Sequence, residues 1–171
     1  MRRRTSCRAL KPRPSLRVAV SSTLRRRVGC ERWLRGIAER VARACGFADG
    51  MLSVAIVGRK RMRRLNREHL GHDFDTDVLS FDLGCDPRAG RIEGEIVVSF
   101  DMARRVARRR ARSDAELGRE LRRELALYVT HGILHLAGYD DAAPEAARRM
   151  HAREDELLTA LGLGPVYSEE G

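Results

Sequence analysis

Hydrophobic and polar positions along the chain follow two periods, which predict strands interleaved with helices. Short alternating or β-branched runs predict strands at residues 16–20, 52–57, 78–81 and 96–100. Longer runs with apolar residues at every third or fourth position predict helices at residues 31–45, 59–70, 101–112, 113–136 and 144–161. Because these elements do not repeat as regular β-α-β units, we expect an α+β fold: one small mixed sheet of about four strands packed with about five or six helices in a single domain.

The long helix before the last one carries two histidines in an otherwise apolar stretch. His131 and His135 are four residues apart, so their side chains share one face at about 6 Å and can reach one ion. Gly138 suits a helix end, and Asp140 and Asp141 follow it directly. The spacing predicts a His/His/carboxylate metal site and leaves open which aspartate completes it. Two helical histidines without a metal are the common alternative.

Positive charge is concentrated at the start of the chain. The formal net charge is +10, and the first 30 residues hold ten basic and no acidic residues, while the rest holds 24 of each. We expect residues 1–14 to be a basic, disordered arm, residues 15–163 to be the metal-binding domain and residues 164–171 to be a tail. A basic arm on a neutral body favours an anionic partner such as RNA or DNA, although a general preference for arginine also explains it.

Composition also limits the cellular setting. No run approaches the roughly 18 apolar residues of a membrane helix, and no apolar segment of a secretory signal follows the first arginines. A mitochondrial-type presequence also fits residues 1–28, which are rich in arginine and serine. The four cysteines are widely spaced and form no CxxC pair, which is typical of a reducing compartment. We therefore expect no membrane contact and a cytoplasmic location.

Two of the predicted helices, at residues 59–70 and 101–112, are rich in arginine. Such charge is usually a solvated face, but it also suits contact with a phosphate backbone. The candidate RNA contacts are Arg59, Arg63, Arg67, Arg104 and Arg108.

Several motifs occur in a fixed order along the chain. They are Leu65-Asn66, the TDVLSF string at 76–81, GEIVVS at 94–99, HGILHLAGYD at 131–140, and then Met150 and Glu154. Together they resemble the YbeY family of bacterial rRNA maturation factors, described as zinc-dependent endoribonucleases, over residues 52–161. The resemblance implies a single-strand-specific, metal-dependent endoribonuclease that acts in 3′-end processing of small-subunit ribosomal RNA and in ribosome biogenesis. The implied partners are ribosomal RNA and the small subunit or its proteins.

The metal motif departs from the family at one position. The family carries three histidines, of which His131 and His135 match the first two and Asp141 occupies the third place. The resemblance therefore selects His131, His135 and Asp141 as ligands of one Zn²⁺, and the carboxylate also admits other divalent metals. Asp140 is then expected to be a helper or a cap.

A second departure concerns RNA cleavage. The family has Tyr-Arg shortly after Leu-Asn, and a proline before TDVLSF, where this chain has His69, Leu70 and Asp75. Arg67 and the basic residues 104–110 are candidates to replace the family arginine, and His69 and His72 are candidates to act near the metal.

Two other functions share features with the nuclease. A non-catalytic ribosome-assembly factor with a structural metal site uses the same motifs and stays open. A zincin-like protease shares the HxxxH spacing but needs glutamate directly after the first histidine, where this chain has Gly132. The sequence thus favours RNA over peptide chemistry.

Overall fold

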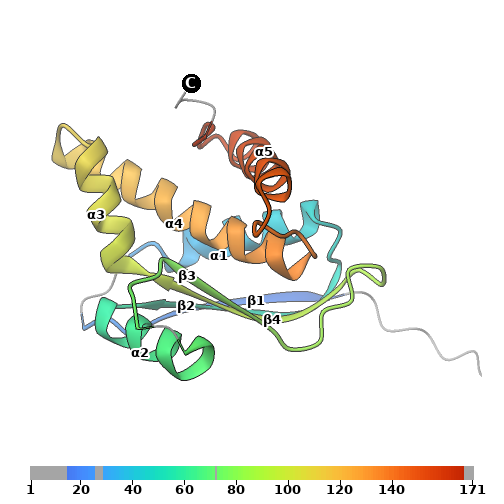
Figure 1. Cartoon of the computed structure of the whole chain (residues 1–171). Helices are drawn as coiled ribbons and strands as arrows, with labels where there is room; N and C mark the ends of the chain where they lie inside the picture. The colour runs from blue at the N-terminus through green and yellow to red at the C-terminus, as the bar shows by residue number, and fades with distance from the viewer. Residues whose placement is uncertain (1–14, 26–28, 72, 168–171) are drawn as a thin grey trace, which may run out of the picture.

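A single mixed sheet forms the base of the molecule, and helices pack on both of its faces (Figure 1). The computed structural model describes residues 15–25, 29–71 and 73–167. Its strands are β1 (Leu16–Ser22), β2 (Asp49–Val57), β3 (Val78–Asp82) and β4 (Arg91–Ser99). Its helices are α1 (Glu31–Ala44), α2 (Arg59–Leu70), α3 (Phe100–Arg110), α4 (Asp114–Leu136) and α5 (Pro144–Ala160). The predicted arm at residues 1–14 lies outside the described residues.

The strands are ordered β1-β2-β4-β3 across the sheet. β1 pairs with β2 and β2 pairs with β4 in parallel, whereas β3 pairs with β4 in the antiparallel direction. A mixed sheet with five helices in the described part of the chain confirms the predicted α+β class. In that part, no helix is both long and apolar enough to cross a membrane.

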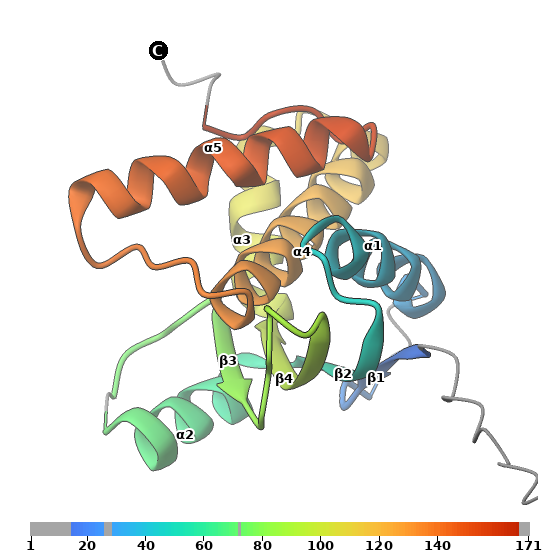
Figure 2. The ribbon, with the colours of Figure 1, turned by 90° about the vertical axis from the view of Figure 1, so that its right-hand side faces the viewer.

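The two faces of the sheet are covered unequally. Helices α1, α3 and α4 lie on one face with α5 stacked on α4, and α2 alone lies on the other (Figures 1 and 2). Because successive strand residues point to opposite faces, Leu52 and Ile56 enter the larger core while Val57 and Val97 pack with Met62 of α2. The helix that carries the two histidines therefore belongs to the main core.

The fourth strand is longer than the pattern predicted. The pattern predicts a strand at 96–100, but β4 begins at Arg91 and Phe100 already belongs to α3. Residues 91–95 pair in register with residues 49–53 of β2. Gly94 interrupts the alternation in the sequence because Leu136 fills its place: a Cβ on Gly94 would lie 2.6 Å from Leu136 Cδ1. Strand pairing therefore extends β4 where the side-chain pattern did not.

Helix α4 is fixed by a cap at its start and by close packing near its end. The Ser113 hydroxyl accepts a hydrogen bond from the Glu116 N–H at 3.3 Å and so caps the start of the helix. At Gly132 the helix touches the sheet so closely that a Cβ there would lie 2.9 Å from Ile96 and from the Ser80 hydroxyl. The helix end that carries the histidines is therefore set directly over β3 and β4.

Residues 163–167 lie against the folded domain. Val166 is 6% exposed, and the Asp155 carboxylate accepts hydrogen bonds from the backbone N–H groups of Val166 and Tyr167 at 2.6 and 3.1 Å. The Arg123 guanidinium donates to the Pro165 carbonyl. This part of the chain thus closes over the outer side of α4 and α5.

Candidate metal centre

Two histidines at the end of α4 converge with an aspartate from the segment that follows. His131 Nε2 lies 3.0 Å from His135 Nε2, and Asp141 oxygens lie 3.7 Å from His131 Nε2 and 3.8 Å from His135 Nε2. Gly138, at φ +91°, takes the left-handed conformation that lets the chain reverse between helix and aspartate. We call His131, His135 and Asp141 the metal cluster, because their ligand atoms lie within 4.8 Å of one another.

The hydrogen bonds of the outer ring nitrogens determine the tautomers of both histidines. His135 Nδ1 lies 3.1 Å from the Tyr139 carbonyl oxygen and His131 Nδ1 lies 2.8 Å from Glu154 Oε1. Both partners are acceptors, so each Nδ1 carries the hydrogen and each neutral ring has an unprotonated Nε2. Two lone pairs then face each other at 3.0 Å, which is unfavourable unless a proton or a metal ion lies between them.

The separations within the metal cluster fit a tetrahedral ion. Nitrogen and oxygen ligands bind zinc at about 2.0–2.2 Å, so tetrahedral geometry places neighbouring ligand atoms about 3.3–3.6 Å apart. The two Nε2 atoms lie 3.0 Å apart, and the nearest Asp141 oxygens are 3.7 Å (Oδ2 to His131) and 3.8 Å (Oδ1 to His135) away, close to that range. The metal cluster can therefore hold one divalent ion once the exposed Asp141 carboxylate turns one oxygen toward both rings.

Glu154 of α5 contacts the metal cluster through His131. Its side chain is fully buried, and its Oε2 has no hydrogen-bond partner among the described residues. Burial lowers the pKa of His131, but the hydrogen bond to Glu154 and the charges of Glu154, Asp141 and Asp77 outweigh it, so the pKa is raised. The surroundings of His131 thus favour positive charge at the ring, whether from a proton or from a metal ion.

A shallow pocket of about 340 Å³ opens beside the two histidines. Val78 and Ser80 of β3 line it, together with Leu70 from the end of α2. Leu70 is 54% exposed and stands where the resemblance places the family arginine. That position does face the metal cluster, and in this chain it presents an apolar side chain.

The candidate arginines of α2 already have acidic partners. Arg59 Nε lies 2.8 Å from Asp75, and Arg63 Nε lies 2.8 Å from Asp73. Arg67 Nη1 lies 3.8 Å from the same Asp73. These pairs tie the segment before β3 to α2, and the Arg63 side chain lowers the pKa of Asp73 by hydrogen bonding.

The candidate arginines of α3 have a different environment. Arg104 and Arg108 are exposed, and four residues apart they share one face of the helix. Neither forms an ion pair with a carboxylate in the part of the chain that the structure describes. Their guanidinium groups are therefore open to a partner from solution.

Among the remaining candidates, His69 lies away from the metal cluster. The His69 ring packs edge-on against Phe81, with ring centroids 5.0 Å apart, on the α2 side of the sheet. His72 is outside the described residues. Asp140 Oδ1 accepts a hydrogen bond from the Ala142 N–H at 3.1 Å, as expected of a turn cap.

Sequence reasoning missed the role of Glu154. Met150 and Glu154 were noted as a motif, but nothing in the sequence assigned the glutamate to a histidine 23 residues away. Its only signal was an acid at a helical position whose neighbours Met150, Leu157 and Leu158 are apolar.

Comparison with known proteins identifies the family. A family model described as Endoribonuclease YbeY matches residues 21–162. The Endoribonuclease YbeY of Anaeromyxobacter sp. (strain Fw109-5) is 43% identical over 154 residues, which cover 90% of this chain and 77% of that protein. The Endoribonuclease YbeY of Geobacter metallireducens is 38% identical over 153 residues, covering 85% and 96%.

A solved structure shares the fold. The solution structure of TM1509 from Thermotoga maritima matches with a TM-score of 0.53 and 25% identity, over 86% of this chain and 91% of that one. The matched region of the family model includes β2, β3 and β4, the last two residues of β1, and the metal cluster. This chain therefore belongs to the YbeY family of endoribonucleases.

Proposed function

We propose that this protein is a metal-dependent endoribonuclease that cleaves single-stranded RNA during maturation of the 3′ end of small-subunit ribosomal RNA. The observation that carries the proposal is the metal cluster, in which the Nε2 atoms of both histidines face Asp141. Membership of a family whose relatives are named endoribonucleases supplies the reaction class.

His131, His135 and Asp141 are the proposed ligands, and zinc is the proposed ion. Two imidazoles and a carboxylate are a known ligand set of catalytic zinc sites, with the fourth position left for water or substrate. When bound, such an ion polarises a phosphoryl oxygen and lowers the pKa of a coordinated water. Because a carboxylate is a harder ligand than imidazole, manganese and similar ions compete better here than at a three-histidine site.

RNA binding is assigned to the two basic helices. Arg104 and Arg108 present free guanidinium groups, whereas Arg59 and Arg63 bind carboxylates on the surface. Exposed ion pairs contribute only about 0–1 kcal/mol, so an RNA phosphate can compete for Arg63 as well. Changing Arg104 and Arg108 together to alanine is expected to reduce the salt slope of single-stranded RNA binding by about 1.4.

Asp141→Ala and Asp140→Ala form a matched pair for testing the ligand assignment. Both remove an exposed aspartate from the same turn, but only Asp141 belongs to the metal cluster. We expect Asp141→Ala to lose bound zinc, measured by elemental analysis, and cleavage of a single-stranded rRNA fragment, while Asp140→Ala keeps both. Full metal content in Asp141→Ala would overturn the assignment.

A cleavage assay on the wild-type protein distinguishes a nuclease from a non-catalytic assembly factor. Wild-type protein loaded with zinc or manganese that cuts neither single-stranded nor ribosomal RNA would overturn the nuclease proposal in favour of a non-catalytic assembly factor. Asp141→His restores the family ligand, and a gain in cleavage would show that the aspartate tunes the site.

The proposed partners are the small ribosomal subunit or its proteins, in the cytoplasm. The positive charge of the chain and the family's link to rRNA maturation support this. Co-sedimentation of the protein with small subunits from a cytoplasmic extract is the test. Recovery of the protein only in fractions that contain no ribosomal subunits would contradict the proposal.

A further inference from the structure

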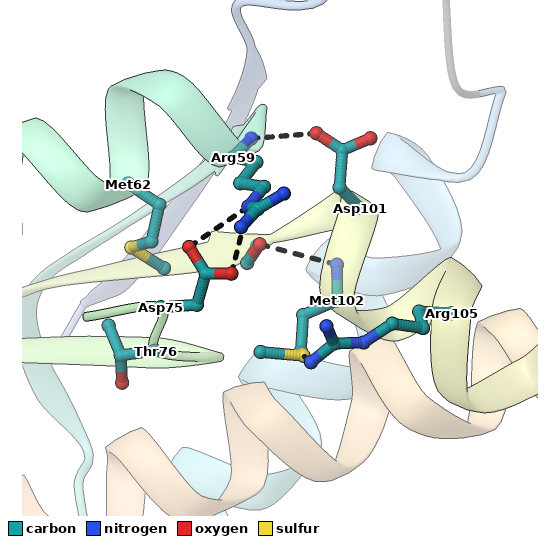
Figure 3. Close-up of a pocket in the computed structure, with 8 residues that line it drawn as sticks. Arg59, Met62, Asp75, Thr76, Asp101, Met102 and Arg105 are labelled. Carbon is teal, nitrogen blue, oxygen red and sulfur yellow. Dashed lines mark hydrogen bonds and ion pairs between the residues drawn. The ribbon is translucent and has the colours of Figure 1, made fainter.

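A cavity separate from the metal cluster opens between α2, the segment before β3, and α3 (Figure 3). Its volume is about 190 Å³, well above the space that a single water or ion needs. Met62 and Met102 lie on either side of Asp75, and Thr76 and Ser99 also line the cavity. The space therefore suits a flat organic ring better than a single ion.

The charges around this cavity balance. Arg59 and Arg105 contribute two positive charges and Asp75 and Asp101 two negative ones. Arg59 Nε lies 2.8 Å from Asp75, and the Arg59 backbone N–H donates to Asp101 at 2.7 Å. A phosphate inside the cavity would meet both carboxylates, so the electrostatics disfavour an anion there. A neutral ring with hydrogen-bond donors and acceptors meets no such penalty.

Arg105 and Met102 together offer a stacking surface. The Arg105 guanidinium lies 2.6 Å from Met102 Sδ and forms no ion pair with the acids of the described residues. RNA bases that leave the helix stack on arginine planes as well as on aromatic rings, and thioethers adapt to ring faces. The low aromatic content of this chain, 5%, makes such non-aromatic surfaces the available ones.

The cavity lies next to the proposed path of the RNA. Thr76 lines it, and two residues further on Val78 lines the pocket beside the metal cluster. Arg104 and Arg108, the proposed phosphate contacts, are on the same helix as Arg105.

We infer that this cavity binds one unpaired nucleobase of the RNA substrate, close to the phosphate at the metal cluster. The inference rests on the proposed function for the identity of the substrate. Met102 and Arg105 stack on the base, and the Arg59–Asp75 pair presents a donor and an acceptor to its edge. The base is bound without covalent change.

Binding of oligonucleotides with single abasic positions tests this inference. The probe is a fluorescently labelled, 2′-O-methylated single strand of fixed sequence, from which one base at a time is removed. Dissociation constants come from fluorescence anisotropy with metal-loaded protein, and a gel confirms that the strand stays intact. Met102→Ala is compared with wild type and with Met51→Ala, a matched control at an exposed methionine on β2.

At one position of the strand, we expect base loss to weaken binding to wild type and Met51→Ala about fivefold, the lower end of the range for a base stacked on a side chain. In Met102→Ala the same base loss is expected to weaken binding less than about twofold, because the stacking surface is already missing in that variant. Arg105→Gln changes an exposed side chain and is expected to show the same reduced sensitivity to base loss as Met102→Ala. This second variant tests the inference if Met102→Ala fails to fold.

Two results would overturn the inference. Equal sensitivity to base loss in wild type, Met102→Ala and Arg105→Gln would place the base elsewhere. Competition by inorganic phosphate without any sensitive base position would show an anion site instead. Because binding is measured without cleavage, a protein that cuts no RNA would refute the proposed function and still report on this cavity.

Discussion

Replacing Glu154 by glutamine tests whether this carboxylate orients His131 for metal binding. Glu154 is fully buried on α5, and its Oε1 accepts the Nδ1–H of His131 at 2.8 Å. Glutamine has the same length and can still accept that hydrogen bond through its amide oxygen. The change therefore removes the negative charge and leaves the packing in place.

The expected loss follows from the two kinds of hydrogen bond. A bond to a charged partner contributes about 1.5–3 kcal/mol and a neutral one about 0.5–1.5 kcal/mol, so the difference is roughly 1–1.5 kcal/mol. That difference corresponds to about five- to tenfold weaker metal binding in Glu154→Gln. Glu154→Ala removes the bond as well, and losses of about 10–100-fold are typical when a metal-binding histidine loses its partner.

Stability of the metal-free protein separates orientation from packing. Above its raised pKa the His131 ring is neutral, so His131 and Glu154 no longer attract each other as ions. Glu154 is then a buried carboxylate, and its Oε2 has no hydrogen-bond partner among the described residues. An amide costs less to bury than a carboxylate, so we expect the melting temperature of metal-free Glu154→Gln to stay unchanged or to rise.

Competition with a chromogenic zinc chelator measures the affinity, and thermal unfolding monitored by circular dichroism measures stability. Glu156→Gln is the matched control, because Glu156 is on the same helix and pairs with Arg153 at the surface. Wild-type affinity in Glu154→Gln would refute an orienting role. Weaker metal binding that came with a lower melting temperature would show that Glu154 acts through packing.

Three further predictions concern packing, a buried pair and pH. Gly132→Ala is expected to destabilise the protein by about 1–3 kcal/mol, because a Cβ there meets β3 and β4 side chains at 2.9 Å. Gly118→Ala, where the same helix has open space, is expected to stabilise it by about 0.5–1 kcal/mol, and equal effects in urea unfolding would contradict the close approach. Arg110→Ala removes the ion-pair partner of the buried Glu124, whose Oε1 lies 2.5 Å from Arg110 Nη1. Because the Arg110 side chain is 34% exposed, we expect the free energy of unfolding to fall by about 1–2 kcal/mol, less than for a fully buried pair. Burial raises the pKa of Glu124 despite Arg110, so this cost should shrink in unfolding curves measured as the pH falls and Glu124 becomes protonated, and a constant cost would argue against the pair. Metal binding needs a neutral His131, whose pKa is raised. Chelator competition should therefore show that metal affinity decreases as the pH is lowered, with a midpoint above the ordinary histidine pKa of about 6.5. A midpoint below that value would contradict the role of Glu154.

The sequence alone determined most of the elements and the core of the metal cluster. Helix α2 matches its predicted range because its apolar positions recur with the helical period, and both ends of α4 follow from local signals at Ser113 and Gly138. The spacing of His131 and His135 placed both rings on one face before any tertiary contact was known. Local periodicity, caps and motif order are properties of neighbouring residues, so the chain itself records them.

Tertiary structure decided what depends on residues far apart. The extent of β4 required its pairing with β2, since Gly94 conceals the strand pattern where Leu136 packs. Glu154 acquired its role only because α5 lies across α4, which brings it to a histidine 23 residues away. The cavity between α2 and α3 likewise exists only where two helices and a strand end meet. These features depend on how the elements pack, and no local pattern encodes a distance between elements.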